Sequence, residues 1–361
     1  MNVLILSKSM HRGGIQTHIL NLSVLLRSSG NRVYVASDIL KEKDRFKENK
    51  IPLCKINFTS HNPFTMFSNL KKLKRIIEDK KIDVVHCQWR ICSVYMQILH
   101  KLGMTKVPFV WSDHVLLNYT KLKSRLTFYG SKAIVSSMDC YNSLKNDYHI
   151  PEDKLSLVYI GIDLEKYDHS DPGIEELRAR LEIRDEYIIT MLCRFDPIKN
   201  HECMLKALNI LVNEQGRNNI KCVIVGEANK EYGDRIRSLV KELKLEENVI
   251  FAGFTESIST LGITDLMVLP SQAEGFPISV IEAFAMKVPV IRTRTGGYSD
   301  VKDYCLDMDF DDYKGLAQKI NYVMDNPDTV EQMCDKAQKF VVDTCTSKVM
   351  LDKLLDIYKQ A

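Results

Sequence analysis

Short apolar blocks alternate with helical patterns through the first half of the chain. The blocks at 3–6 and 32–36 are rich in β-branched residues, and between them apolar residues recur at three- and four-residue intervals up to Gly30. Further strands are predicted at 83–86, 107–111, 133–135 and 155–158. Strands that alternate with helices in this way predict a parallel sheet with helices on both faces.

The same alternation restarts after a polar stretch that ends at Gly173. Strands are predicted at 187–193, 220–226, 248–251, 265–269 and 288–292. Because 361 residues exceed what one hydrophobic core usually supports, we expect two α/β domains. The expected domains are two Rossmann-like units at 1–165 and 166–340, with a C-terminal helix at 341–361 that returns to the N-terminal domain. If the units pack as facing lobes, a ligand would bind in a deep cleft between their strand ends.

Composition narrows the class of protein. Hydrophobic residues make up 45% and charged residues 27% of the chain, which is typical of a soluble globular protein and excludes collagen-like or disordered chains. No apolar run is long enough to span a bilayer, and the first residues do not resemble a secretory signal, so we expect a cytoplasmic protein. The ten cysteines form no C-x-x-C pair, which argues against a zinc site and a disulfide framework and favours buried, reduced thiols.

Charge is distributed unevenly between the two halves. Residues 1–165 hold 25 Lys and Arg against 14 Asp and Glu, a net charge of +11, whereas residues 166–361 hold 25 against 33, a net charge of −8. A basic half suits an anionic membrane surface or a lipid-linked anionic substrate, with clusters at 71–75 and 121–125. The alternative is that these clusters are solvated helix faces. Nucleic acid is not an expected partner, because no binding motif or interleaved aromatic residues accompany the basic segments.

Two segments carry candidate chemistry. Gly13 and Gly14 follow the first strand and open the first helix, where free backbone amides can approach an anion closely, although an ordinary turn would have the same sequence. The segment 270–284 follows the strand at 265–269, and Pro277 fits the first position of a helix whose early amides are free to bind an anion. Glu274 lies in the loop and Glu282 less than two turns into that helix.

The two glutamates suggest a ligand with two sets of hydroxyl groups. A carboxylate accepts hydrogen bonds in pairs, so one glutamate can hold the hydroxyls of a sugar ring and the other those of a ribose. This division fits a nucleotide sugar. The alternative is a pair of solvent-exposed helix charges.

Glu274 and Glu282, within Glu-Gly-Phe-Pro-…-Glu-Ala, resemble the E-x7-E motif of retaining glycosyltransferases, most closely glycosyltransferase family 4. The resemblance covers nearly the whole chain and includes, in order, Gly13-Gly14, Gly161-Ile162-Asp163, Arg194 with Lys199, Val225-Gly226-Glu227, Gly253-Phe254 and Gly296-Gly297. It implies the GT-B fold, in which two facing Rossmann-like domains bind acceptor (N-terminal) and nucleotide sugar (C-terminal).

The resemblance also assigns roles in the C-terminal domain. Arg194 and Lys199 would clamp the donor pyrophosphate, and such cations can neutralise a departing nucleoside diphosphate without a metal ion. Glu274 would hold the sugar hydroxyls and Glu282 the ribose. The remaining implied donor contacts are the amides of Gly275, Phe276 and Ile278, the Gly13-Gly14 loop, and Phe254 beside the base.

The remaining candidates for catalysis or metal binding are two histidines near strand ends and a group of aspartates. His114 stands in the segment 111–114 that ends the predicted strand, and it matches a histidine that enzymes of the resembled family place near the transferred sugar. It is therefore a candidate catalytic residue, and His86 is a weaker candidate. Asp309, Asp311 and Asp312 contain the D-x-D pattern of metal-dependent transferases, but they precede a helical stretch. We therefore expect a helix cap there, and neither a metal nor another cofactor.

The resulting hypothesis is a metal-independent, retaining hexosyltransferase that moves a sugar from a UDP-sugar to an acceptor hydroxyl. The expected acceptor is a lipid-linked glycan in bacterial surface polysaccharide synthesis (capsule, O-antigen or exopolysaccharide), at the inner face of the membrane. Two alternatives stay open at this point. One is a nucleotide-sugar 2-epimerase, which needs no acceptor, and the other is a non-catalytic nucleotide-binding partner.

Overall fold

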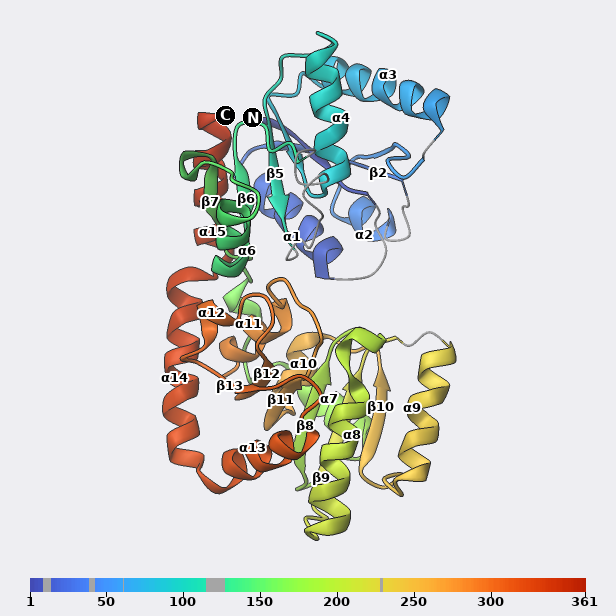
Figure 1. The fold of residues 1–361 in the computed structure, drawn as a ribbon, viewed down its shortest axis with the longest axis vertical. Helices are drawn as coiled ribbons and strands as arrows, with labels where there is room; N and C mark the ends of the chain where they lie inside the picture. The colour runs from blue at the N-terminus through green and yellow to red at the C-terminus, as the bar shows by residue number, and fades with distance from the viewer. Residues whose placement is uncertain (9–13, 39–42, 61, 115–126, 228–229) are drawn as a thin grey trace. The chain divides into compact units, whose positions relative to one another are not determined.

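The computed structural model describes residues 1–8, 14–38, 43–60, 62–114, 127–227 and 230–361. These residues form two compact units (Figure 1). Unit 1 contains Met1–Gly161 and Ser347–Ala361, and unit 2 contains Ile162–Thr346. In the part of the chain that is described, no helix is long and apolar enough to cross a membrane.

Unit 1 is built on a parallel sheet of seven strands in the order β3-β2-β1-β4-β5-β6-β7. The strands are β1 (Asn2–Leu6), β2 (Arg32–Ser37), β3 (Leu53–Lys55), β4 (Val84–Cys87), β5 (Phe109–Asp113), β6 (Ala133–Val135) and β7 (Leu155–Leu157). The helices are α1 (Gly14–Ser28), α2 (Lys43–Glu48), α3 (Pro63–Asp79), α4 (Arg90–Lys101), α6 (Met138–Asn146), the short η1 (Glu152–Lys154) and α15 (Ser347–Gln360).

Alternate residues of most strands of unit 1 enter two separate cores. Leu4 and Leu6 pack on one face of the sheet, whereas Val3 and Ile5 pack on the other, because successive side chains of a strand point to opposite faces. The second core also contains buried residues of the last helix, α15, among them Leu354. The end of the chain therefore belongs to the hydrophobic core of unit 1.

Unit 2 is built on a parallel sheet of six strands in the order β10-β9-β8-β11-β12-β13. The strands are β8 (Tyr187–Leu192), β9 (Ile220–Val225), β10 (Val249–Gly253), β11 (Leu266–Leu269), β12 (Val290–Thr293) and β13 (Leu306–Met308). The helices are η2 (Leu164–Lys166), α7 (Pro172–Arg180), η3 (Pro197–Lys199), α8 (His201–Asn209), η4 (Ile210–Glu214), α9 (Lys230–Glu242), α10 (Ser257–Gly262), α11 (Ile278–Ala285), α12 (Tyr298–Val301), α13 (Tyr313–Asp325) and α14 (Pro327–Thr344).

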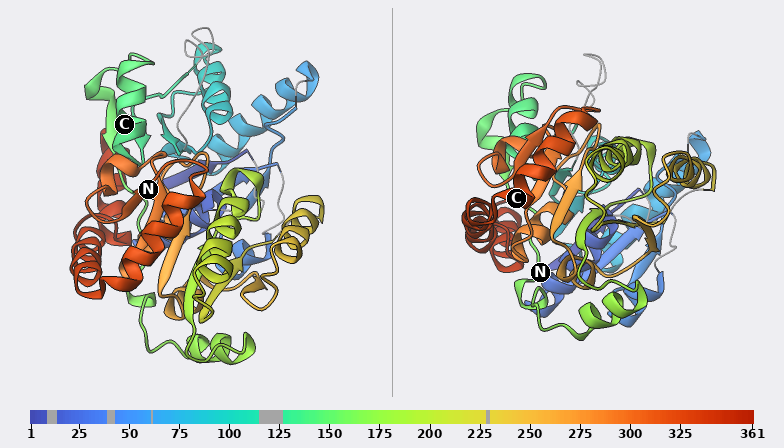
Figure 2. Two further views of the ribbon diagram at one scale, coloured as in Figure 1. Left: turned by 60° about the horizontal axis from the view of Figure 1, so that its bottom comes forward. Right: turned by 90° about the horizontal axis from the view of Figure 1, so that it is seen from below.

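The predicted α/β architecture is confirmed in both units. Every predicted strand is present within about two residues, and helices lie against each parallel sheet (Figures 1 and 2). Two strands were not predicted, β3 and β13. Each has three residues and lies at an edge of its sheet, where the sequence shows no continuous apolar run. All ten cysteines are free thiols, and eight of them are buried.

Candidate active site

Two of the residues predicted to bind the donor meet at one edge of the sheet of unit 2. Arg194 and Lys199 follow β8, and Glu274 follows β11, the neighbouring strand. The carboxyl ends of neighbouring parallel strands share an edge, so their loops adjoin. The amide of Gln272 donates to the carbonyl oxygen of Ile198 at 2.8 Å, and Nζ of Lys199 lies 2.5 Å from Oε1 of Glu274.

The ion pair between Lys199 and Glu274 is nearly buried, with side chains 12% and 9% exposed. Arg194 differs, because its side chain is 64% exposed and its nearest carboxylate, Asp196, is 3.8 Å away. An ammonium has three N–H donors and a carboxylate has two oxygens, so the pair keeps hydrogen-bonding capacity for a ligand. Lys199 and Glu274 thus form a fixed charge pair, while Arg194 keeps its guanidinium in solvent.

The helix after Glu274 begins one residue later than the first-position assignment of Pro277 implies. Pro277 has φ −69° and ψ 117°, so it is the N-cap, and α11 begins at Ile278. Before it, Phe276 is buried, and its ring packs on Gly297, where an added Cβ would lie 2.7 Å from the ring. Gly275 and Ile278 are only half-buried. The loop from Glu274 to Ile278 is therefore fixed by packing at Phe276, with accessible residues on both sides.

Glu282 lies in a second polar cluster of unit 2. Its Oε1 accepts a hydrogen bond from the Tyr167 hydroxyl at 2.6 Å and another from the Ser257 hydroxyl at 3.1 Å. Burial raises the pKa of the Glu282 carboxyl, and these two hydrogen bonds act in the opposite direction. The carboxylate that was predicted to bind a ribose is therefore half-buried and held from one side.

Phe254 follows β10 and is 52% exposed. A phenylalanine at a strand end is often part of the core, but here the ring is at the surface. Gly253 before it has φ +68°, and the pairing of β10 with β9 shifts its register between Phe251 and Gly253, which turns the chain at this point. About half of the Phe254 side chain is therefore exposed at the end of β10.

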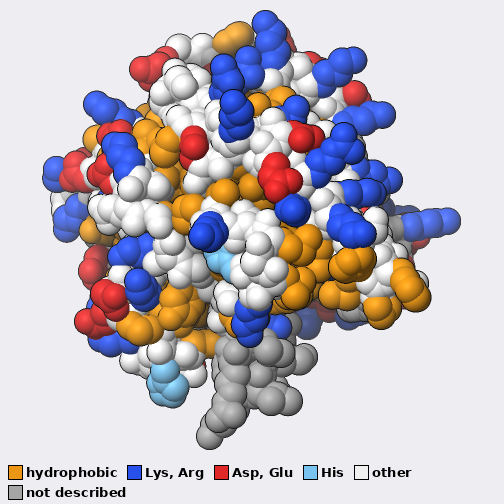
Figure 3. Space-filling view, turned by 90° about the horizontal axis from the view of Figure 1, so that it is seen from above, with side chains coloured by type: hydrophobic (Ala, Val, Ile, Leu, Met, Phe, Trp, Pro, Cys, Tyr) orange, Lys and Arg blue, Asp and Glu red, His pale blue; other side chains and the backbone are white. Residues whose placement is uncertain are grey.

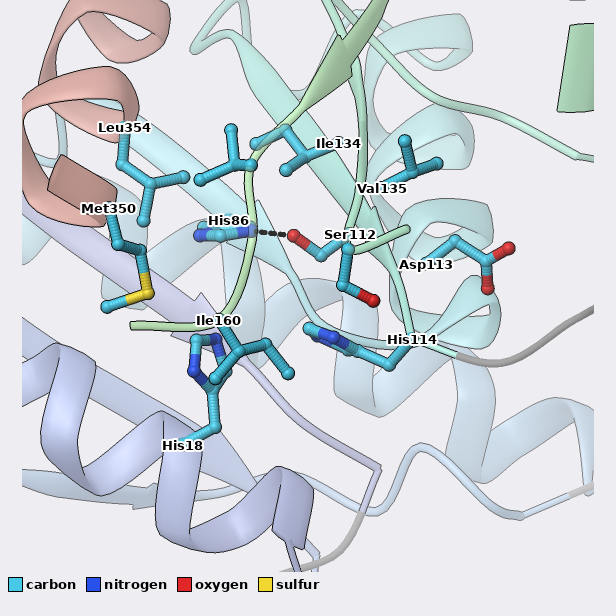
Figure 4. Close-up of a pocket in the computed structure, with 12 residues that line it drawn as sticks. His18, His86, Ser112, Asp113, His114, Ile134, Val135, Ile160, Met350 and Leu354 are labelled. Carbon is cyan, nitrogen blue, oxygen red and sulfur yellow. Dashed lines mark hydrogen bonds between the residues drawn. The ribbon is translucent and has the colours of Figure 1, made fainter. Parts of the chain in front are cut away.

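In unit 1, the half-buried His114 follows β5 and lies among buried polar residues (Figure 4). Its Nε2 lies 2.5 Å from Oε1 of Gln88. The ring of His18, from α1, meets the His114 ring edge-on with centroids 5.3 Å apart. The amide nitrogen of Gln88 lies 3.2 Å from Nε2 of His86 on β4. Three histidines from separate elements are thereby connected.

The connection continues into the last helix. His86 has its Nε2 2.6 Å from the Ser112 hydroxyl and its Nδ1 2.6 Å from the hydroxyl of Tyr358, which belongs to α15. His86 is buried, so both ring nitrogens have a polar partner away from water. This arrangement indicates a structural role for His86, the weaker of the two histidine candidates.

A small cavity of about 10 Å³ lies beside His114 and is lined by His18, His86, Ser112 and Ser136 among others (Figure 4). Three buried atoms around it have no hydrogen-bond partner among the described residues: Nδ1 of His18, Nδ1 of His114 and Oγ of Ser136. Buried polar atoms are normally hydrogen-bonded, and this volume is about that needed for one water-sized group. The cavity can therefore hold one water molecule or one ligand hydroxyl.

Burial favours the neutral form of the three histidines in this group. Burial lowers the pKa of His18 to about 4 and that of His86 to about 3. The pKa of His114 is also well below its usual value, because of burial and of the neighbouring His18 and His86. At neutral pH His114 therefore offers a hydrogen bond rather than a positive charge.

Two family descriptions match this chain in consecutive segments. "Glycosyltransferase Family 4" matches residues 12–166, and "Glycosyl transferases group 1" matches residues 173–340. The first segment falls in unit 1 and the second in unit 2, apart from a few residues at the boundary. The chain belongs to glycosyltransferase family 4.

Relatives of this glycosyltransferase are distant in sequence but match it over most of their length. An uncharacterized glycosyltransferase of Methanocaldococcus jannaschii is 24% identical, over 80% of this chain and 78% of the relative. The UDP-Gal:α-D-GlcNAc-diphosphoundecaprenol α-1,3-galactosyltransferase of Escherichia coli is 22% identical, over 80% and 78%. The crystal structure of HepE of Anabaena in complex with UDP has a TM-score of 0.87, with 18% identity, and covers 100% of both chains. The family 4 glycosyltransferase has the GT-B fold.

The structure describes some of the other predicted positions of the glycosyltransferase and leaves others outside the described residues. Gly13 lies outside the described residues, as does the basic cluster at 121–125, while Gly14 begins α1. Asp312 is the N-cap of α13, and its side chain accepts from the amide of Gly315 at 2.9 Å, so the predicted helix cap is confirmed. Asp309 pairs with Arg294. Over the described ranges, no group of three or more His, Cys, Asp or Glu side chains is placed to hold a metal ion.

Several partners of the candidate residues could not be found from the sequence. Tyr167 lies 115 positions from Glu282, and Tyr358 lies 272 positions from His86. No local pattern links such pairs. Gln88 is an exception, because it stands two residues after His86, directly after β4, and residues at this spacing in a strand point to the same face of the sheet.

Proposed function

We propose that this family 4 glycosyltransferase transfers a sugar from a UDP-sugar to a hydroxyl of a lipid-linked glycan, with retention of anomeric configuration and without a metal ion. The observation that carries the proposal is the buried pair of Lys199 and Glu274, which lies directly before the N-terminus of α11. The donor identity is supported by the Anabaena structure, which contains UDP, and by the E. coli relative, which is named for UDP-galactose.

In this proposal, different residues of unit 2 bind different parts of the donor. Lys199, Arg194 and the first amides of α11 would bind the pyrophosphate, since cations and a helix N-terminus both stabilise phosphate oxygens. These groups would also stabilise the negative charge that develops on the departing UDP, which is the usual task of a metal ion in such transfers. Glu274 would accept hydrogen bonds from the sugar, and Phe254 would stack on the base.

The chemical step needs no protein nucleophile. The acceptor oxygen attacks the anomeric carbon from the face that UDP leaves, and the bond from that carbon to the β-phosphate oxygen breaks. The acceptor proton passes to a phosphate oxygen of the departing UDP. The neutral His114 would donate or accept a hydrogen bond at a hydroxyl of the transferred sugar, which fits the unpartnered Nδ1 and the adjoining cavity.

The acceptor proposal rests on the surface of unit 1. On helix α3, Phe64 is 87% and Phe67 is 52% exposed, and the ammonium of Lys71 lies 4.6 Å from the Phe67 ring centroid. Lys72 and Arg75 are exposed on the following turns. Figure 3, which looks onto unit 1, shows basic side chains bordering apolar patches. Aromatic side chains beside lysines suit the interface of an anionic membrane, where a lipid-linked acceptor would be found.

A transfer assay tests the donor and the site. Purified protein is incubated with nucleotide sugars and undecaprenyl-linked acceptors, and the products are identified by mass spectrometry. The anomeric configuration of the product is read by NMR, and EDTA should leave the rate unchanged. Glu274→Ala and Arg194→Ala should each reduce transfer by about 100-fold or more, as expected for groups that stabilise the transition state. Glu246→Ala, an exposed glutamate of unit 2, is the control. Full transfer by both site variants would refute these assignments.

Liposome sedimentation tests the membrane contact. The protein should bind vesicles that contain anionic lipid in a salt-sensitive manner, and Phe64→Ser together with Phe67→Ser should weaken this binding. The matched control is Phe310→Ser, because Phe310 in unit 2 is 51% exposed. If the α3 variant binds as well as the control variant, α3 is not the membrane surface.

A further inference from the structure

Three elements of unit 2 meet at the carboxylate of Glu282. Tyr167 directly follows η2, Ser257 is the first residue of α10, and Glu282 lies on α11. The Tyr167 and Ser257 hydroxyls donate to Glu282 Oε1 at 2.6 and 3.1 Å, and the two hydroxyl oxygens are 3.4 Å apart. All three atoms thus form one compact hydrogen-bonded group.

Both donors bind the same oxygen of the carboxylate. The other oxygen, Oε2, has no hydrogen-bond partner among the described residues, and it is not one of the buried atoms that lack a partner. Glu282 as a whole is half-buried, so Oε2 is the oxygen that is left for a ligand. A carboxylate held by one oxygen presents the other in a fixed direction, which is the arrangement needed to accept hydrogen bonds from a ligand.

The two hydroxyls also favour the charged form of Glu282. Burial and the nearby Glu256 oppose ionisation of this carboxyl, whereas hydrogen bonds from Tyr167 and Ser257 favour it. An ionised carboxylate accepts stronger hydrogen bonds than a neutral one, and it accepts at both oxygens. Without the two donors, Glu282 would be a poorer and less well oriented acceptor.

We propose that Tyr167 and Ser257 are positioning residues that orient Glu282 toward the ribose of the donor, so that they determine how strongly the enzyme distinguishes ribose from deoxyribose. The inference rests on the proposed function, because the ribose belongs to the nucleotide-sugar donor proposed there and Glu282 is given to it only by the family resemblance. Tyr167 and Ser257 themselves need not touch the ligand. Their effect reaches the nucleotide through the direction and charge of one carboxylate.

The test compares nucleotides that differ in one hydroxyl. Binding of UDP, 2′-deoxy-UDP and 3′-deoxy-UDP is measured by calorimetry on the intact protein, on Tyr167→Phe and on Ser257→Ala. The intact protein should bind UDP roughly tenfold more tightly than the analogue that lacks the recognised hydroxyl, since hydrogen bonds to a charged group have about this strength. Tyr167→Phe should weaken UDP binding by about fivefold and leave that analogue nearly unaffected.

Tyr187→Phe is the matched control, because Tyr187 is also a partly buried tyrosine of unit 2 that packs against its core. It should leave the ratio between UDP and its deoxy analogues unchanged. Thermal unfolding identifies any variant that does not fold. If Tyr167→Phe does not fold, the binding ratio is compared between the intact protein and Ser257→Ala, which is a smaller change. An unchanged ratio in both Tyr167→Phe and Ser257→Ala would overturn the inference.

A double-mutant cycle shows whether Tyr167 acts through Glu282. In a Glu282→Gln background, Tyr167→Phe should no longer alter the ratio, because the carboxylate that transmits its effect is gone. An equal effect in both backgrounds would contradict the positioning role. In transfer assays Tyr167→Phe should raise the donor KM and leave kcat nearly constant.

Failure of the proposed function gives a different result. If UDP binds but no sugar is transferred, the function is wrong and the ribose ratios still test the inference. If the protein binds another nucleoside diphosphate, such as GDP or ADP, the same ribose and deoxyribose pairs of that nucleotide are used. If none of the three binds, both the function and the inference are refuted.

Discussion

The ammonium of Lys199 lies 2.5 Å from the carboxylate of Glu274, and the two side chains are nearly buried. Each is therefore the main partner of the other's charge. Replacing one of them would leave the second charge buried without compensation, which is far more costly than losing an exposed ion pair. Mutational tests of this site must consequently separate stability from catalysis.

We expect Lys199→Ala to lower the free energy of unfolding by about 3 kcal/mol or more, because the Glu274 charge then lacks its partner. Arg194→Ala should change it by less than about 1 kcal/mol, because Arg194 is exposed. Urea unfolding measures both. The double variant Lys199→Ala/Glu274→Gln should regain part of the lost stability. Equal stability of the Lys199→Ala and Arg194→Ala proteins would contradict the buried-pair interpretation.

The buried histidines predict acid sensitivity. His18 has its pKa lowered to about 4, whereas an unfolded chain binds the proton near pH 6.5. The unfolded state therefore binds more protons between these values, and stability falls as the pH decreases from 6.5 to 4. For His18 the loss should reach roughly 3 kcal/mol at pH 4, with a plateau above pH 7.

Unfolding measured from pH 8 to pH 4 checks this expectation. His18→Asn should flatten the curve in the acid range, although it also removes packing. His169→Gln, at an exposed position of unit 2, serves as the control and should leave the curve unchanged. A stability that is constant between pH 7 and pH 5 would show that His18 is not buried in its neutral form.

Tyr358→Phe should destabilise the protein by about 1–3 kcal/mol. The substitution removes the hydroxyl that lies 2.6 Å from Nδ1 of His86 and leaves that buried nitrogen with a poorer partner. Tyr34→Phe, a partly buried tyrosine of the same unit, should cost much less. Thermal unfolding gives the difference. If the two variants melt at the same temperature, the hydroxyl of Tyr358 makes no net contribution.

Gly226 should not tolerate a side chain. Its φ is +139°, and an added Cβ would lie 2.2 Å from the carbonyl oxygen of Cys193, directly before Arg194. Gly226→Ala must therefore shift the loop that carries Arg194, and both stability and transfer should fall severely. Gly216→Ala is the matched control, because it also has positive φ but open space around it, and it should cost only about 1 kcal/mol. If the two variants lose similar amounts of stability, the loss at Gly226 comes from its backbone conformation and not from a clash with the Cys193 carbonyl.

The sequence predicted what local patterns encode. Strands such as β1 and β11 are continuous apolar runs, and Glu274 and Glu282 lie in one segment that a motif can identify. The edge strand β13 has only three residues and one fully buried side chain, so it has little pattern to detect. Pro277 was assigned to the first helical turn, yet its extended ψ makes it the cap, a difference that tertiary packing decides.

Contacts between distant segments were beyond the reach of the sequence. Nothing around Tyr167 indicates that its hydroxyl meets Glu282, and the partnership of Lys199 with Glu274 depends on two loops that adjoin only in the folded sheet. Charge patterns also could not show which side chains lie together on the folded surface. The cluster at 71–75 was recognisable as basic, but the exposure of Phe64 and Phe67 beside it depends on which face of α3 packs inward.

The last helix has a consequence for biosynthesis. Residues of α15 such as Leu354 and Tyr358 complete a core that begins with Val3, and the carbonyl of Ala361 accepts a hydrogen bond from Ser131. Helix α15 is synthesised after the whole of unit 2, so translation must pass through a second domain before the core of unit 1 can close. A nonsense codon upstream of α15 would therefore impair a domain whose strands are encoded far earlier in the message.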